Sequence, residues 1–124
     1  MCVYKNKNIL AVDDYEDNLL LIQYIFESLG CNVKTACNAT NGLIEVKQFC
    51  PDLIILDLMM PDMSGIEFMQ CLKQDGLLDM PILLLTANQN VDRQEAKDAD
   101  SICYKPIDIT ILVDEVKTLL NKKG

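Results

Sequence analysis

Histidine is absent from this chain of 124 residues. Its absence excludes Ser-His and Cys-His nucleophile pairs, histidine-ligated zinc, and a phosphohistidine on the chain itself. The six cysteines form no C-x-x-C pair, so we interpret them as reduced thiols that act as small hydrophobic residues. Any chemistry must therefore use carboxylates, hydroxyls and lysine.

Long apolar segments and an excess of basic residues are also lacking. No apolar stretch approaches the roughly 20 residues that cross a bilayer, and residues 1–8 lack the apolar centre of a signal peptide. The chain has 11 basic and 19 acidic residues and a formal net charge of −8, whereas nucleic-acid phosphates select for lysine and arginine clusters. We therefore expect a single domain, residues 1–124 with a core at about 7–121, that is cytoplasmic and contacts neither membranes nor nucleic acid directly.

Short, continuous apolar runs are the most regular feature that is present. Such runs are typical of parallel strands covered on both faces. We predict five strands, at Ile9–Val12, Val33–Ala36, Leu53–Asp57, Ile82–Thr86 and Ser101–Tyr104. Helical stretches alternate with them, and the polar segment 88–98 is interpreted as a helix with a thin buried stripe or as a marginally stable one. Five strands alternating with five helices predict an α/β fold with right-handed crossovers and a parallel sheet.

Polar side chains stand where four of these strands end. Asp13 and Asp14 follow the first strand, Asp57 ends the third, Thr86 ends the fourth, and Lys105 follows the fifth. Ligands of parallel sheets bind at the carboxyl ends of the strands. We therefore expect three acids, a hydroxyl and a lysine to share one crevice.

This combination of side chains is suited to a hard cation and a phosphoryl group. Three carboxylates in close proximity repel one another, which raises their pKa values, and a divalent cation relieves the repulsion. Mg²⁺ prefers oxygen ligands and readily accepts phosphate oxygens. Asp57, alone at its strand end, is the best candidate for a nucleophile that forms an acyl phosphate, whereas the adjacent Asp13 and Asp14 are better suited to hold the metal.

The set of motifs resembles the receiver domain of two-component response regulators, the CheY-like superfamily. The matching features are the Asp13-Asp14 pair, the run D-L-M-M-P-D-M-S-G that begins at Asp57, Thr86 followed by alanine, and Lys105 followed by proline. The likeness extends from about Ile9 to Leu120. It implies a doubly wound (βα)5, flavodoxin-like three-layer sandwich with strand order 2-1-3-4-5.

The resemblance also implies a phosphorelay function. Asp57 would accept a phosphoryl group from a phosphohistidine on a sensor histidine kinase or a histidine phosphotransfer protein. Asp13 or Asp14, Asp57 and the backbone carbonyl of Met59 would ligate Mg²⁺, for which Mn²⁺ can substitute. The domain would assist only its own phosphorylation and dephosphorylation and would not be an enzyme with an external substrate.

Two further site residues and one departure follow from the same comparison. Lys105 would contact the phosphate, and the Lys105-Pro106 bond, typically cis in this family, would aim the lysine inward. Thr86 would turn toward the phosphoryl group. Where the family often has an aromatic residue three positions before the lysine, this chain has Ile102. The output would be a protein–protein contact through the 88–121 face, expected of a stand-alone receiver, with a homodimer through that face as a second mode.

Three other functions are compatible with parts of the pattern. A Mg²⁺-dependent phosphatase with an aspartyl nucleophile usually has a second acid two residues later, where this chain has Met59. An unphosphorylated interaction module or thiol sensor would not need the intact acids and lysine. A flavin binder of the same fold class needs a hydroxyl- and glycine-rich phosphate loop after the first strand, where Asp13 and Asp14 would repel the phosphate.

Overall fold

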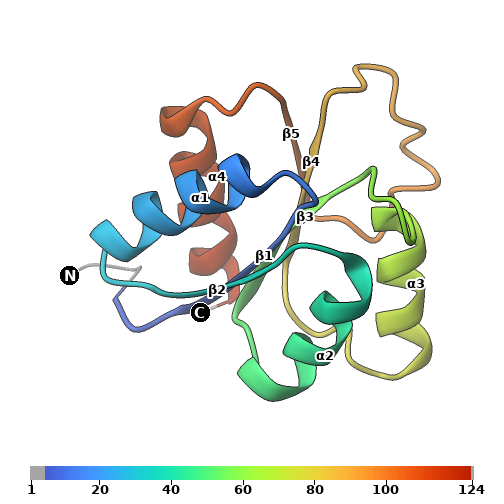
Figure 1. Cartoon of the computed structure of the whole chain (residues 1–124), viewed down its shortest axis with the longest axis horizontal. Helices are drawn as coiled ribbons and strands as arrows, with labels where there is room; N and C mark the ends of the chain where they lie inside the picture. The colour runs from blue at the N-terminus through green and yellow to red at the C-terminus, as the bar shows by residue number, and fades with distance from the viewer. Residues whose placement is uncertain (1–4, 124) are drawn as a thin grey trace.

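The computed structural model describes residues 5–123 and contains five strands and four helices among them (Figure 1). In chain order the elements are β1 (Asn8–Val12), α1 (Glu16–Ser28), β2 (Asn32–Ala36), α2 (Ala39–Phe49), β3 (Leu53–Asp57), α3 (Gly65–Gln74), β4 (Ile82–Thr86), β5 (Ser101–Tyr104) and α4 (Ile109–Lys123). The predicted bounds of β3, β4 and β5 are confirmed, and β1 and β2 each begin one residue earlier than predicted.

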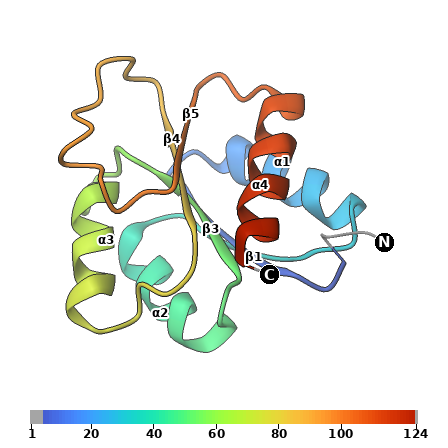
Figure 2. The ribbon, with the colours of Figure 1, turned by 180° about the vertical axis from the view of Figure 1, so that it is seen from behind.

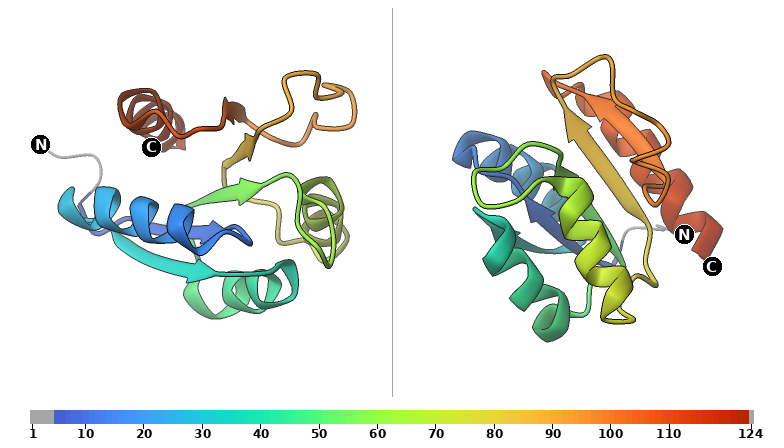
Figure 3. Two further views of the ribbon diagram at one scale, coloured as in Figure 1. Left: turned by 45° about the horizontal axis from the view of Figure 1, so that its top comes forward. Right: turned by 90° about the vertical axis from the view of Figure 1, so that its right-hand side faces the viewer.

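The strands form one parallel sheet in the order β2-β1-β3-β4-β5, which confirms the predicted doubly wound topology. Helices α1 and α4 cover one face of the sheet, and α2 and α3 cover the other (Figures 1 and 2). Neighbouring strand arrows point the same way, so all five carboxyl ends lie at one edge (Figure 3). This edge is where the polar residues that follow the strands are brought together.

Alternating side chains of each strand supply two hydrophobic layers. Ile9 and Ala11 of β1 pack with Phe26 of α1 on one face, while Leu10 and Val12 pack with Phe68 of α3 on the other. All six side chains are fully buried. Burial of a large apolar side chain is worth about 1.5–3 kcal/mol. The central strands are therefore held from both sides, and their ends form a rigid platform for the site.

The segment between β4 and β5 differs from the prediction, because it contains no helix at 88–98. It is a loop with turns at residues 89–90 and 93–98, and the second of these contains one helix-like hydrogen bond from the Ala96 N–H to the Asp92 carbonyl at 3.1 Å. The loop projects beside α3 (Figures 1 and 2). Only Ala96 of this stretch is buried, and Val91 is half-buried. The side chain of Asn88 accepts a hydrogen bond from the backbone N–H of Asn90, a local turn that competes with helix formation. Asp92 accepts from the N–H groups of Gln94 and Glu95 and so caps the 93–98 turns, which do not continue into a helix. The (βα)5 expectation is thus wrong by one helix.

None of the helices in residues 5–123 has both the length and the apolar composition needed to cross a membrane. Cys37, Cys50, Cys71 and Cys103 are free thiols, and of the cysteines in residues 5–123, Cys31 and Cys103 are buried. Cys2 lies outside the described residues. The buried pair supports the interpretation of cysteine as a small hydrophobic residue.

Candidate functional site

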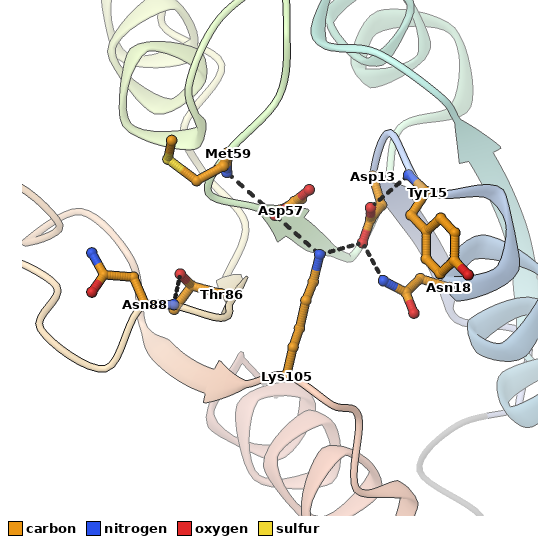
Figure 4. A network of polar contacts seen from close by, with 8 residues as sticks. All are labelled: Asp13, Tyr15, Asn18, Asp57, Met59, Thr86, Asn88 and Lys105. Atoms are coloured by element: carbon orange, nitrogen blue, oxygen red, sulfur yellow. Dashed lines mark hydrogen bonds and ion pairs between the residues drawn. The ribbon is translucent and has the colours of Figure 1, made fainter.

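Lys105 joins two acids at the carboxyl edge of the sheet (Figure 4). Its Nζ lies 3.2 Å from Asp13 Oδ2 and 3.3 Å from Asp57 Oδ1. Both carboxylates are almost completely buried, and the lysine side chain is 21% exposed. The ends of β1, β3 and β5 thus converge on one ionic cluster that remains open to solvent on one side.

The Asp13 carboxylate is held by three groups. Oδ1 accepts a hydrogen bond from the backbone N–H of Tyr15 at 2.9 Å, and Oδ2 accepts one from Asn18 Nδ2 at 3.2 Å in addition to its ion pair with Lys105 (Figure 4). Tyr15 is the N-cap of α1 and offers no side-chain cap of its own. Asn18, in the first turn of α1, is a site residue that the sequence did not reveal, since no motif marks it.

Asp57 carries the most perturbed carboxyl group of the site. Its Oδ1 accepts a hydrogen bond from the backbone N–H of Met59 at 3.2 Å. Burial is the main cause that raises the pKa of Asp57 to about 7, and the negative charge of Asp13 raises it further, whereas Lys105 and the Met59 N–H lower it. Near neutral pH, a substantial fraction of this carboxyl therefore carries a proton when no cation is bound.

Asp14 completes a carboxylate cluster of the kind that holds a metal. It is exposed, unlike its neighbour, and carboxylate oxygens of Asp13, Asp14 and Asp57 lie within 4.8 Å of one another. Oxygen-only donors with excess negative charge fit Mg²⁺ in number and chemistry. The backbone N–H of Met59 donates a hydrogen bond to Asp57, while metal ligation by the Met59 carbonyl stays a prediction.

Thr86 lies beside this cluster at the end of β4, where it is buried. Its hydroxyl oxygen accepts a hydrogen bond from the backbone N–H of Asn88 at 2.9 Å (Figure 4). Its carbonyl accepts one from the backbone N–H of Lys105 at 2.8 Å, which connects the ends of β4 and β5. The Lys105-Pro106 bond is cis, as the resemblance to receiver domains implies. The hydroxyl is therefore hydrogen-bonded within its own loop.

The loop after Asp57 is closed by Gly65, the last residue of the D-L-M-M-P-D-M-S-G run. The backbone N–H of Gly65 donates to the carbonyl of Leu58 at 2.7 Å, and a Cβ at Gly65 would lie 2.8 Å from the carbonyl oxygen of Asp57. Ser64 and Glu67 then form a reciprocal capping box at the start of α3. The S-x-x-E spacing was a readable signal for this helix start.

Comparison with known proteins agrees with this geometry. The family model described as the response regulator receiver domain matches residues 9–117. The chain is 38% identical over 120 residues to the alkaline phosphatase synthesis transcriptional regulatory protein PhoP of Bacillus subtilis, covering 94% of this chain and 50% of PhoP. It is 34% identical over 114 residues to the aerobic respiration control sensor protein ArcB of Escherichia coli, covering 89% of this chain and 15% of ArcB.

The solved structures agree on the fold. Chemotaxis protein CheY4 of Vibrio cholerae superposes with a TM-score of 0.85 at 28% identity, covering 92% of this chain and 98% of that one. Among curated relatives, by contrast, the chain spans half the length of PhoP. The likeness therefore concerns one domain that these relatives have in common.

Proposed function

The chain belongs to the response regulator receiver domain family, and from this premise we propose that it accepts a phosphoryl group on Asp57 in a Mg²⁺-dependent reaction. The observation that carries the proposal is the pairing of buried Asp57 with Lys105, 3.3 Å apart, beside two further acids. A nucleophilic carboxylate next to a fixed cation is suited to receive a group that carries several negative charges.

In the proposed step, the phosphoryl group moves from a nitrogen of the donor phosphohistidine to a carboxylate oxygen of Asp57. The contacts from Lys105 and from the Met59 N–H both fall on Oδ1 of Asp57, so we assign Oδ2 as the attacking oxygen. A new O–P bond forms at Oδ2 while the P–N bond of the donor phosphohistidine breaks, and the electron pair of that bond returns to the imidazole of the donor. Lys105 would neutralise charge on the phosphoryl oxygens throughout.

The two neighbouring acids are assigned different roles in metal binding. Asp13 already holds Tyr15, Asn18 and Lys105, whereas Asp14 is exposed. We assign Asp14, Asp57 and the Met59 carbonyl as direct ligands and Asp13 as a group that orients Lys105 and the ion's water. A bound Mg²⁺ would supply the positive charge that keeps these carboxylates ionised and binds phosphoryl oxygens.

The partners follow from the same chemistry. The chain has no histidine of its own, so the phosphohistidine must be on another protein. This donor would be a sensor histidine kinase or a histidine phosphotransfer protein, which the chain would meet in the cytoplasm. Thr86 would turn its hydroxyl to the phosphoryl group, and the hydrogen bond from Asn88 would carry that change into the 88–100 loop. Output would be binding of a downstream protein through the 88–121 face, with homodimerisation through the same face as a second mode. No external substrate is expected.

A thiol sensor is the alternative from a different class. Burial raises the pKa of the Cys103 thiol to about 11, so this thiol remains protonated and poorly reactive. Cys37 and Cys50 are exposed and remain the candidates for that alternative. A phosphatase would need an acid where Met59 stands.

Labelling with acetyl phosphate tests the proposal directly. Intact mass spectrometry of the protein with Mg²⁺ should reveal one added phosphoryl group, lost in Asp57→Asn and in EDTA but retained in Asp75→Asn, a matched exposed carboxylate of α3's C-terminal end. Mn²⁺ should restore labelling after EDTA. An unchanged mass would favour the thiol sensor or interaction module, and sustained turnover of a phosphate monoester would favour the phosphatase.

A further inference from the structure

Asp62 connects the loop after β3 to the beginning of α2, although 22 residues separate it from Thr40 in sequence. Its Oδ2 accepts hydrogen bonds from the backbone N–H of Thr40 at 2.9 Å and from Thr40 Oγ1 at 3.0 Å. Its Oδ1 accepts them from the backbone N–H of Ala39 at 3.1 Å and of Met63 at 3.2 Å. Each carboxylate oxygen of Asp62 therefore accepts two hydrogen bonds.

The first turn of α2 requires such a partner. Helix termini leave several backbone N–H groups without acceptors, and the side chain of the N-cap residue Asn38 accepts only that of Asn41, at 2.8 Å. No acidic residue lies in the first turn of α2 itself. The hydrogen bonds from Thr40 and Ala39 lower the pKa of Asp62 to about 2, so the carboxylate is charged at every physiological pH.

The other end of this connection is the loop that presents groups to Asp57. Residues 58–64 are closed at their base by the hydrogen bond between Gly65 N and the Leu58 carbonyl, and Met59 donates its N–H to Asp57. The side chains of Met60 and Met63 pack on the core below the loop. Apolar packing does not fix the direction of a backbone group, whereas the directional bonds of Asp62 do.

We propose that Asp62 is a positioning residue for the metal and phosphoryl site, which it serves by fixing the 58–64 loop against the first turn of α2. The inference rests on the proposed function, because that function assigns the Met59 carbonyl and Asp57 to metal binding. Loss of the Asp62 carboxylate would let the loop tip move, and the Met59 carbonyl would no longer be held in place. Metal affinity would fall although no ligand had been replaced.

The competing explanation is that Asp62 only caps α2. Asn38→Ala separates the two roles, because it removes a cap from the same helix end and leaves the loop attached. Asp62→Ala removes both the cap and the attachment. Thr40→Val removes the hydroxyl donor from the α2 side, so adding it to Asp62→Ala should have little further effect on metal affinity.

Three measurements on the intact chain decide between these explanations. Calorimetric titration with Mg²⁺ should give about tenfold weaker binding for Asp62→Ala, the lower end of the range for groups that support metal ligands, and a near-normal value for Asn38→Ala. Metal-free amide exchange by NMR should be faster across residues 58–64 in Asp62→Ala alone. Labelling by acetyl phosphate at subsaturating Mg²⁺ should slow in parallel and recover at high Mg²⁺.

Equal Mg²⁺ affinity and loop exchange in the two variants would overturn the inference and leave helix capping as the whole role of Asp62. Failure of the proposed function gives a different pattern. In that case the wild-type protein remains unlabelled, while titration and amide exchange still report whether Asp62 holds the loop.

Discussion

Replacement of Asp57 by asparagine should stabilise the metal-free protein, and by an amount that depends on pH. The buried carboxyl binds its proton more tightly in the folded chain, with a pKa of about 7, than in the unfolded chain, where the ordinary value is 3.8. Between these values the folded state holds more protons, so the free energy of unfolding falls as the pH rises and levels off above the folded pKa. Asparagine has no such ionisation and keeps an oxygen for the Met59 N–H.

The magnitude follows from the same two pKa values. A rise from 3.8 to about 7 corresponds to an upper limit of about 4 kcal/mol at 1.36 kcal/mol for each tenfold change in proton affinity. The Asp14 side of the site is exposed, and solvent screening reduces the expected effect to about 2 kcal/mol. For a domain of this size, such a gain raises the melting temperature by about 8 °C.

Urea unfolding in EDTA, followed by far-UV circular dichroism, measures this difference. The stability of Asp57→Asn minus that of the wild type should be near zero at about pH 4 and reach about 2 kcal/mol at pH 8. Asp75→Asn is the control, because it removes one negative charge from an exposed position. A difference that does not change with pH, or an asparagine variant that is less stable at pH 8, would refute the argument from burial. Saturating Mg²⁺ should stabilise the wild type and diminish the advantage of the variant.

Three further substitutions test other parts of the structure. Lys105→Met should destabilise the metal-free protein at pH 8 by about 1–2 kcal/mol, because Asp13 and Asp57 then lack their cation; urea titrations should give a smaller loss at pH 5, where Asp57 is protonated. Gly65→Ala should lower the free energy of unfolding by about 1–3 kcal/mol in the same assay, because the new Cβ would clash with the backbone carbonyl of Asp57. An unchanged urea midpoint would mean that α3 can shift to make room. Ala96→Asp should speed amide exchange across residues 88–99 with no loss of helical circular dichroism, since it buries a charge in a segment that is not helical; a loss of helical signal would contradict this assignment.

The sheet could be predicted because its signal is local. Strands buried on both faces are continuous apolar runs, and the polar residues that end them need no tertiary information to be recognised. The bounds of β3 and β4 follow from such runs, Leu53–Asp57 and Ile82–Thr86. Because the strands are parallel, their carboxyl ends lie at one edge of the sheet. The proximity of Asp13, Asp57 and Lys105 could therefore also be predicted.

The segment 88–98 could not be predicted in the same way. Its few apolar residues are compatible with a helix, but a weak helix depends on how much of its surface the rest of the molecule covers. In the structure Ala96 alone is buried, and the side chains of Asn88 and Asp92 bind nearby backbone N–H groups. The balance between local hydrogen bonds and burial was therefore decided by packing.

The amino-acid order by itself determined which side chains lie at the carboxyl edge, because each buried strand is a continuous apolar run whose end can be recognised from adjacent residues. Tertiary structure alone decided that Asp13 is buried and held by Asn18 while Asp14 faces solvent, and that Asp62 reaches Thr40. These pairings depend on helices being placed against a twisted sheet, and no pattern within a short stretch of chain encodes the distance between two such elements.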